Sequence, residues 1–199
     1  MIEKPFYQSC ENNKQPILKV LSKYLSKGDH VLEIGSGSGQ HSVFFSNHLD
    51  YIEWFCSDRL ENHAGIHLWH EENPAKNLHA PIELDVAKFE DWPNRKFDAV
   101  FTSNTVHIMS WENDVLMFQG VSRVLSKGGL LLIYGPFKME GEFTSESNKK
   151  FENWLKQQGA HMGIRDIEAV NLLAKENQMN FFGQIPMPAN NFILIWQKD

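Results

Sequence analysis

The sequence has few cysteines and few basic residues, and both shortages limit what the chain can be. Its 199 residues include only Cys10 and Cys56, too few for a disulfide framework and without the spacing of a metal site, so we expect both to be reduced. The 19 Lys and Arg side chains are outnumbered by 25 Asp and Glu, which gives a net charge of −6. Because nucleic-acid binding needs clustered Lys and Arg, this balance argues against a nucleic-acid partner.

Long apolar runs and linkers are missing as well. No apolar stretch approaches the roughly 20 residues that a membrane span needs, and the first ten residues, MIEKPFYQSC, lack the apolar core of a signal peptide. These absences predict a cytoplasmic protein with no membrane partner. No repeat and no linker rich in Pro, Gly or Ser divides the chain, so we expect one domain over residues 1–199.

Strand-like and helix-like runs alternate along the chain. Strands are expected at 30–35, 51–58, 81–86, 97–104 and 129–135, and helices near 10–25, 40–49, 61–72 and 111–125. This alternation predicts an α/β fold with a doubly wound, mainly parallel sheet. Pro16 is expected in the first turn of the first helix, and Asp166 is expected to cap a helix over 165–177. Two strand-like runs then follow with only a short turn between them, which predicts a C-terminal antiparallel hairpin.

Three glycines at alternate positions mark the run VLEIGSGSGQHSVFF, residues 31–45. Gly35, Gly37 and Gly39 lie between a buried strand and a helix, where doubly wound sheets bind nucleotide-like ligands. Glycine permits positive φ and close approach to the backbone, so we interpret the run as a ligand loop rather than an empty tight turn. The dinucleotide fingerprint G-x-G-x-x-G would need a glycine at Gln40.

The spacing instead resembles the first motif of class I S-adenosylmethionine-dependent methyltransferases, (D/E)-x-G-x-G-x-G, with Glu33 as the acidic residue. The resemblance covers residues 28–199 and implies a Rossmann-like methyltransferase fold with S-adenosyl-L-methionine as the cofactor. It implies that the loop passes under the methionine and ribose portions of the cofactor, with Ser36 and His41 among the contacts. That cofactor carries sulfonium and ammonium groups and no phosphate, so nearby acidic residues favour it.

Later positions are similar to the same superfamily. Asp58 ends the second predicted strand, where a carboxylate would bind the ribose hydroxyls, and Arg59 follows it as a further cofactor contact. Asp85 and Val86 end the third predicted strand, where the resemblance implies adenine recognition by a carboxylate and an apolar neighbour. The alternatives are a helix-capping role for Asp58 and a turn role for Asp85.

A narrower resemblance covers nearly the whole chain. The segments ENNKQPIL, VLEIGSGSGQH, NTVHI, LIYGPF, GIRD and PMPANN together resemble the methyltransferase-like 26 family, a group of small proteins with little assigned biochemistry. That family has Arg-Asn-Lys where this chain has Asn12, Asn13 and Lys14. The resemblance implies a methyltransferase fold and cofactor, and it names no acceptor.

The candidates for chemistry follow the fourth predicted strand, whose end faces the transferable methyl group in this fold. Asn104 is a candidate for positioning cofactor or acceptor. His107 is the catalytic candidate because an imidazole pKa suits proton transfer near neutrality, and its alternative is a hydrogen-bonded structural role. Methyl transfer needs a base only if the acceptor must lose a proton, so the lack of a catalytic triad excludes nothing.

Two segments are expected to cover the site. Residues 1–28 are predicted to form an N-terminal helical lid, from which Tyr7 and Asn13 close over the cofactor. Residues 134–165, a polar stretch after the fifth strand, are predicted to cover the acceptor site. Asn190 and Asn191 fall in the hairpin turn, where asparagine is common for backbone reasons.

No metal is expected. His63, His67 and His70 recur at helical spacing, but Ile66 and Trp69 better supply the buried face, which leaves the histidines partly solvated. The zinc motif H-E-x-x-H is absent.

The sequence therefore predicts an S-adenosylmethionine-dependent methyltransferase that acts on a small-molecule O, N or S acceptor. The motif (D/N)-P-P-(Y/F) is absent after the fourth strand, which disfavours an amide or nucleobase nitrogen as acceptor. One alternative is a protein that binds the cofactor without catalysis. Another is an NAD(P)-dependent oxidoreductase, which Gln40 and the terminal hairpin disfavour. The oligomeric state stays open.

Overall fold

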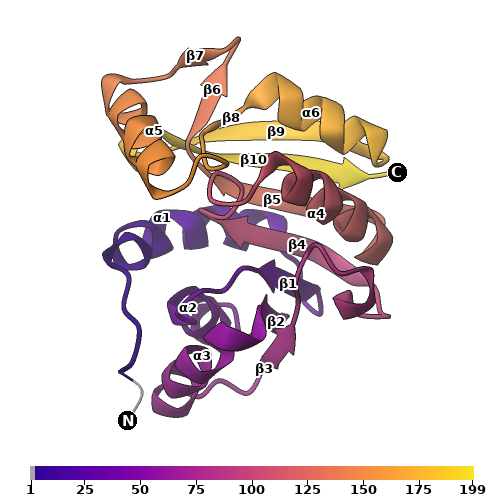
Figure 1. Cartoon of the computed structure of the whole chain (residues 1–199). Coiled ribbons are helices and arrows are strands. Elements are labelled where there is room, and N and C mark those ends of the chain that lie inside the picture. The colour runs from indigo at the N-terminus through magenta and orange to yellow at the C-terminus, as the bar shows by residue number, and fades with distance from the viewer. Residues whose placement is uncertain (1–2) are drawn as a thin grey trace.

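A seven-stranded sheet forms the centre of the computed structural model, which describes residues 3–199 (Figure 1). Its strands are β1 (His30–Ile34), β2 (Glu53–Asp58), β3 (Leu78–Glu83), β4 (Phe97–Ser103), β5 (Leu125–Gly135), β9 (Met179–Met187) and β10 (Asn191–Lys198). In the order β3-β2-β1-β4-β5-β10-β9, the first five strands run parallel, and β10 is antiparallel to both β5 and β9. The predicted α/β class, mainly parallel sheet and terminal hairpin are confirmed.

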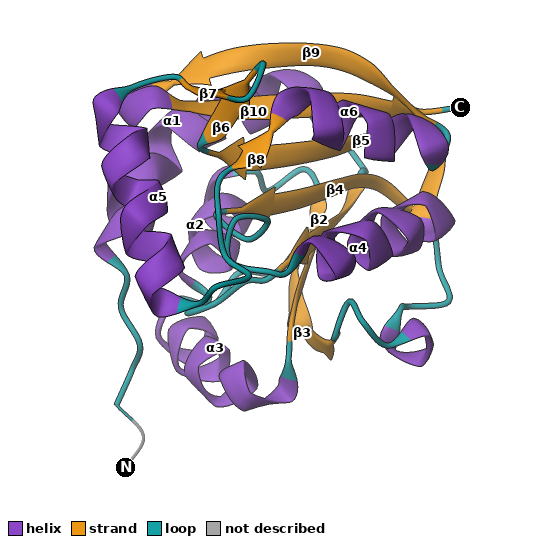
Figure 2. Ribbon diagram, turned by 45° about the horizontal axis from the view of Figure 1, so that its top comes forward, coloured by secondary structure: helices purple, strands orange, loops and turns teal. Residues whose placement is uncertain are grey.

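Helices cover both faces of the sheet (Figure 2). The helices are α1 (Gln8–Tyr24), α2 (Gln40–His48), α3 (Leu60–Glu72), α4 (Trp111–Val124), α5 (Glu146–Gln158) and α6 (Ile167–Glu176). One core cluster joins the sheet to α1, α2 and α3, and a second joins it to α4 and α6. Successive residues of β1 alternate between them: Val31 belongs to the first cluster and Leu32 to the second. Burial on both faces explains why β1 reads as a nearly continuous apolar run.

Two local predictions were wrong. The first helix begins at Gln8, so Pro16 lies inside it rather than in its first turn, and the carbonyl of Asn12 has no helical donor at residue 16. The third strand ends at Glu83, so Asp85 and Val86 lie beyond it. The chain turns there because Asp85 Oδ1 accepts a hydrogen bond from the Ala87 N–H at 3.0 Å, a local bond typical of turns.

The segment 134–165 contains regular structure that the sequence analysis did not predict. The short strands β6 (Phe137–Met139), β7 (Glu142–Phe143) and β8 (Arg165–Asp166) form a second sheet, and α5 begins after Ser145. Ser145 Oγ accepts from the Asn148 N–H at 3.1 Å, which caps the helix. As predicted, the side chain of Asp166 caps α6, accepting from the Glu168 N–H.

The N-terminal part of the chain and α5 lie at the same end of the molecule. Both α1 and α5 stand beside the carboxyl ends of β4 and β5, and the two views agree on this (Figures 1 and 2). Of the predicted N-terminal segment 1–28, Met1 and Ile2 lie outside the described residues. Among residues 3–199, no helix combines the length and apolar character required to cross a lipid bilayer.

Candidate active site at the carboxyl ends of the strands

The three glycines between β1 and α2 all have left-handed backbone conformations. Their φ angles are 71° at Gly35, 58° at Gly37 and 88° at Gly39, values that favour glycine. A Cβ at Gly35 would lie 2.9 Å from Thr105 Oγ1, and one at Gly39 would lie 3.1 Å from the Cα of Ile66. The protein's own packing therefore requires glycine at these two positions.

Gly37 differs from the other two glycines. A Cβ there would meet only the ring of Tyr7, at an ordinary contact distance of 3.6 Å. The outer surface of the loop is thus covered at Gly37 by a side chain of the N-terminal segment. Tyr7 is itself about half exposed. Gly37 is the position in the loop where a ligand can approach the backbone once that ring moves.

The buried side chain of Glu33 stabilises the loop by hydrogen bonds. Its buried carboxylate accepts hydrogen bonds from the hydroxyls of Ser36 and Ser42 and from Trp54 Nε1. Burial raises the pKa of Glu33, and these three donors oppose that rise. Because the donors come from the loop, α2 and β2, the carboxylate holds three elements together around the glycines.

Asp58 lies directly beside the loop. Its Oδ2 accepts from the Gly37 N–H at 2.7 Å, and its Oδ1 accepts from the Arg59 N–H at 2.8 Å and from Asn62 Nδ2 at 2.7 Å. A carboxylate offers about four acceptor positions, so one position on Oδ2 stays open. The neighbouring Arg59 side chain is mostly exposed and pairs with Glu61 at 2.9 Å.

The N-terminal segment is attached to the helix that follows the loop. Gln40 Oε1 accepts from the Tyr7 N–H at 2.7 Å, and Gln40 Nε2 donates to Glu11 Oε1 at 2.9 Å. Next to it, Asn13 Oδ1 lies 2.7 Å from His41 Nε2, with both side chains buried. Burial lowers the pKa of His41 to about 4, so this imidazole is neutral at pH 7. In the sequence, Gln40 is notable only as a missing glycine, and no local motif indicates this attachment.

A cavity of about 380 Å³ opens beyond Asn13, between α1, α5 and the ends of β4 and β5. It is lined by amide, hydroxyl, aromatic and proline side chains: Ser9, Asn12, Asn13, Pro16, Asn104, Tyr134, Pro136, Ser147, Asn148, Phe151, Pro188, Ala189 and Asn191. The structure thus brings the predicted residues Asn13 and Asn104 together. Most of the other lining residues were missed, because they are scattered along the chain and form no local motif.

Asn104 follows β4 and has a left-handed backbone, with φ at 57°. A non-glycine residue in this region is uncommon and is found often at functional sites. The turn role predicted for Asn190 agrees with its own φ of 58°. Asn191 does more than turn the chain, because its Nδ2 donates to the Tyr134 hydroxyl at 3.0 Å and it lines the cavity.

His107 lies behind the cavity wall rather than in it. Its ring is almost fully buried, packs edge-on against Phe151 with centroids 5.3 Å apart, and leaves Nδ1 without a partner among the described residues. Burial, followed by the charge of Arg165, lowers the pKa of His107 to about 4. The predicted near-neutral pKa was therefore wrong, because the sequence could not reveal how completely this ring is buried.

The three histidines weighed as metal ligands, His63, His67 and His70, lie on α3 and do not line the cavity. His63 Nε2 is 2.9 Å from the Asp58 carbonyl oxygen, and His70 Nε2 is 3.7 Å from Cys56 Sγ. Ile66 is fully buried, as expected for the inner face of this helix. Within residues 3–199, no group of three or more His, Cys, Asp or Glu side chains is placed to hold a metal ion.

Three solved structures show what this fold resembles. An O-methyltransferase family protein from Burkholderia thailandensis matches 96% of this chain and 57% of its own, with a TM-score of 0.83 and 13% identity. The S-adenosylmethionine-dependent methyltransferase SibL in its apo form matches 96% and 55%, with a TM-score of 0.80 and 14% identity. An O-methyltransferase family 2 protein from Planctomyces limnophilus, in complex with apigenin, matches 96% and 60%, with a TM-score of 0.79 and 15% identity.

These likenesses establish the fold: it is that of the S-adenosylmethionine-dependent methyltransferases. The chain spans somewhat more than half the length of the three proteins it matches. The chain belongs to the family described as protein of unknown function (DUF938), whose family model matches residues 4–198. The resemblance to the methyltransferase-like 26 family stays a prediction.

Proposed function

We propose that the chain transfers a methyl group from S-adenosyl-L-methionine to a small-molecule O, N or S acceptor. The observation that carries this proposal is the contact between the Gly37 N–H and Asp58 Oδ2, 2.7 Å apart at the carboxyl ends of β1 and β2. The loop surface at Gly37 is covered only by the ring of Tyr7, and a cavity of about 380 Å³ opens between α1, α5 and the ends of β4 and β5. The names of the similar structures, which include an O-methyltransferase family protein and an S-adenosylmethionine-dependent methyltransferase, support the same class.

The residues present fit the proposed cofactor. Gly37 leaves room beside the backbone, and the open acceptor position of Asp58 suits a ribose hydroxyl. Two carboxylates, Glu33 and Asp58, are buried around the loop, which suits a cofactor with sulfonium and ammonium groups. Gln40 in place of the third dinucleotide glycine and the antiparallel β9–β10 hairpin disfavour the dinucleotide-dependent oxidoreductase. When bound, S-adenosylmethionine supplies an activated methyl group.

We assign the individual roles as follows. The loop residues brace and contact the cofactor, Asp58 binds the ribose, and Asp85 and Val86 contact the adenine from beyond β3. The full set of proposed cofactor contacts is Asn13, Glu33, Gly35, Ser36, Gly37, Gly39, His41, Asp58, Arg59, Asp85, Val86 and Asn104. Residues 1–28 act as the lid and 134–165 as the cover of the acceptor site within one domain, so that water is excluded from the reacting groups.

His107 is proposed as the proton acceptor for the transfer. Its imidazole is neutral, and Nδ1 has no partner within residues 3–199, so in the tautomer with the hydrogen on Nε2 this nitrogen can take a proton from an acceptor that must ionise. Because the ring is almost fully buried, packs against Phe151 and does not line the cavity, this role requires the acceptor or a water to reach Nδ1 past Phe151.

Calorimetric titration tests the cofactor class first. We expect S-adenosylmethionine and S-adenosylhomocysteine to bind and NADH not to bind. Asp58→Asn, which keeps the shape but removes the charge, should weaken S-adenosylhomocysteine binding about tenfold or more, since hydrogen bonds to charged groups contribute about 1.5–3 kcal/mol. Asp50→Asn removes a charge at an exposed turn and serves as the control. Tighter binding of NADH than of S-adenosylhomocysteine would overturn the proposal.

Transfer itself needs a second measurement. Incubation with a methyl-labelled donor and a metabolite mixture should give a labelled product that depends on the enzyme. Cofactor binding without any labelled product would favour the alternative, a cofactor-binding protein without catalysis.

A further inference from the structure

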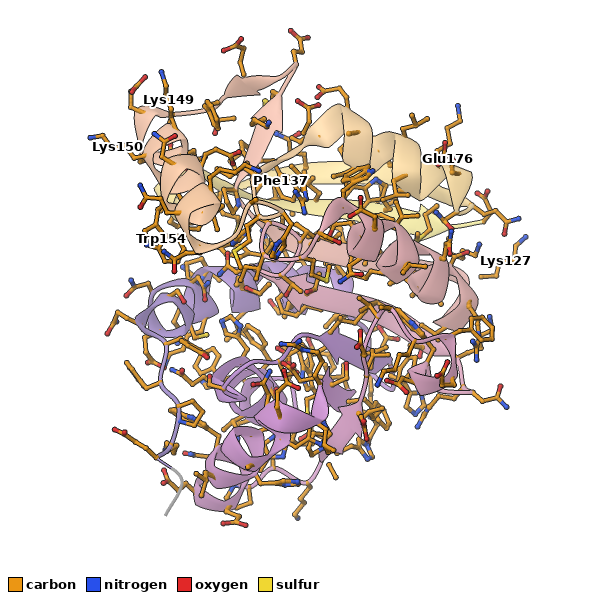
Figure 3. All side chains as sticks on the ribbon, viewed as in Figure 1. Lys127, Phe137, Lys149, Lys150, Trp154 and Glu176 are labelled. Atoms are coloured by element: carbon orange, nitrogen blue, oxygen red, sulfur yellow. The ribbon has the colours of Figure 1, made fainter. Side chains whose placement is uncertain are left out.

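The cavity between α1 and α5 contains no ionisable acid or base apart from one phenol. None of its 13 lining residues is Asp, Glu, Lys, Arg or His, and five of them are asparagines. Charged residues make up 22% of the whole sequence, so their absence from this wall sets the cavity apart from the rest of the surface. On α5, Lys149 and Lys150 project away from the molecule (Figure 3), while Asn148 and Phe151 line the cavity.

The amide groups are oriented by bonds within the protein. Asn148 Nδ2 donates to Thr144 Oγ1 at 2.9 Å and to the Asn190 carbonyl oxygen at 3.1 Å. Asn191 Nδ2 donates to the Tyr134 hydroxyl at 3.0 Å and to the Pro188 carbonyl oxygen at 3.2 Å. Both pairs of N–H donors are therefore in use, and the amide oxygens are what these two asparagines can offer a ligand.

Further groups extend the same wall. The Tyr134 hydroxyl accepts from Asn191 Nδ2 and lies beside the side-chain amide of Asn13, so the phenol belongs to the same network of amides. The side chain of Asn104 makes no hydrogen bond to the described residues, so both its amide oxygen and its N–H groups are available. Phe151 forms an aromatic wall of the cavity, and its ring is held in place by stacking on Trp154, with ring centroids 5.7 Å apart.

We propose that this cavity is the acceptor pocket and that it selects an uncharged acceptor bearing hydroxyl or N–H donors on a flat, largely apolar body. The donors bind the amide oxygens of Asn148 and Asn191, and the flat body packs against Phe151 and the neighbouring prolines. A carboxylate, phosphate or ammonium group in the pocket would lose water without gaining a charged partner, which is costly. This assignment rests on the proposed function, because it takes the occupant to be the molecule that is methylated.

Three phenols of similar size and different charge test the selectivity: 4-hydroxybenzamide, 4-hydroxybenzoate and tyramine. Binding is followed by protein NMR at millimolar concentration, with the protein saturated with S-adenosylhomocysteine. We expect the neutral amide to bind at least about tenfold more tightly than the anion or the cation, because a charged probe would lose water in the pocket without gaining a charged partner. Equal or tighter binding of either charged probe, or no binding of any probe, would overturn the assignment.

Two tryptophan variants on α5 locate the binding site. Ser147→Trp fills the cavity from its wall, whereas Lys150→Trp adds the same ring on the outward face of the helix (Figure 3). We expect Ser147→Trp to weaken 4-hydroxybenzamide binding at least about tenfold and Lys150→Trp to leave it unchanged. Unchanged binding in a folded Ser147→Trp variant would place the probe elsewhere. The affinity of both variants for S-adenosylhomocysteine, measured on the same samples, should equal that of the unmodified protein. If the unmodified protein itself does not bind S-adenosylhomocysteine, the proposed function is refuted instead.

A charge variant tests the same wall from α1. Asn12→Asp keeps the oxygen that accepts from Gln8 Nε2 and places a negative charge at the cavity. It should raise the affinity for tyramine relative to 4-hydroxybenzamide by roughly three- to tenfold. Gln15→Glu makes the same amide-to-carboxylate change at an exposed site on the same helix, outside the cavity, and should leave that ratio unchanged. An equal shift in both variants would mean that the ratio reports net charge and not the pocket, which would contradict the assignment.

Discussion

At the residue scale, substitutions at Gly37 and Gly28 distinguish an effect on ligand binding from an effect on stability. Gly37→Ala adds a Cβ where φ is 58°, and Gly28→Ala adds one where φ is 89° and no atom lies within 4 Å. Both changes carry left-handed strain of about 1–2 kcal/mol, so both should lower the melting temperature by similar amounts. Only Gly37→Ala should weaken S-adenosylhomocysteine binding, by about tenfold or more in calorimetry. Equal affinities for the two variants would mean that the ligand passes elsewhere.

His107 carries the second prediction at this scale. Because burial lowers its pKa to about 4, the imidazole stays neutral and able to accept a proton until the pH falls near that value. The low-pH limb of the transfer rate should therefore lie near pH 4 and not near neutrality. His107→Gln should remove that limb and slow transfer by about 10²–10⁴, the range for general-base assistance, with unchanged affinity for S-adenosylhomocysteine.

The measurement is a pH–rate profile with the acceptor found by the labelled-methyl screen. A Gln variant that binds S-adenosylhomocysteine more weakly but transfers at the normal rate when saturated would make His107 a cofactor contact. Alignment of the acceptor alone would then have to account for the rate.

At the scale of elements, the attachment of the N-terminal segment to α2 should control ligand release. Gln40→Ala removes the bonds to the Tyr7 N–H and to Glu11, so the segment over Gly37 should open more often. We expect faster dissociation of S-adenosylhomocysteine in stopped flow, by about thirtyfold, since the two lost bonds together contribute about 2 kcal/mol. Gln15→Ala, an exposed change on α1 that makes no contact with Gln40, is the control. An unchanged dissociation rate would exclude a lid at this position.

The elements themselves differ in how well the sequence reveals them. Strands β1 and β4 were predicted because burial on both faces leaves an apolar run. Helix α5 was missed because most of its residues are polar, although Phe151, Trp154 and Leu155 recur at helical spacing. The start of α1 was misplaced because its N-cap residue, Tyr7, makes no side-chain capping bond and so leaves no signal.

The candidate site likewise has one part that the sequence predicts, the glycine loop, and one part that it does not, the cavity. The glycine loop is local in sequence, so its spacing identified Gly35, Gly37 and Gly39 and pointed to Asp58 at the next strand end. The cavity is assembled by the fold from residues as far apart as Ser9 and Asn191, and no spacing rule connects them. The burial of a single ring, and so its pKa, likewise depends on packing that the sequence does not display.

At the scale of the whole molecule, buried titrating groups make stability depend on pH. Burial lowers the pKa values of His41, His70 and His107 to about 4, from an ordinary value of 6.5. Between those values the unfolded chain binds protons that the folded protein does not, so these histidines make stability rise as the pH rises from 4 to 6.5. Burial raises the pKa of Asp114 from 3.8 to about 7 in spite of its bond to Arg165, and this carboxyl makes stability fall as the pH rises over the whole of the same range.

A comparison of variants isolates one histidine from these opposing effects. The full shift for the almost fully buried His107 corresponds to about 3 kcal/mol, which is present above pH 6.5 and lost as the pH falls toward 4. In urea unfolding at about pH 5 and about pH 7, His107→Gln should therefore lose less stability on acidification than the unmodified protein, by about 2 kcal/mol. His161→Gln, at an exposed histidine, should follow the unmodified protein. If His107→Gln instead shows the full acid-induced loss, the imidazole is not held neutral in the folded state, and its proposed role in accepting a proton fails with it.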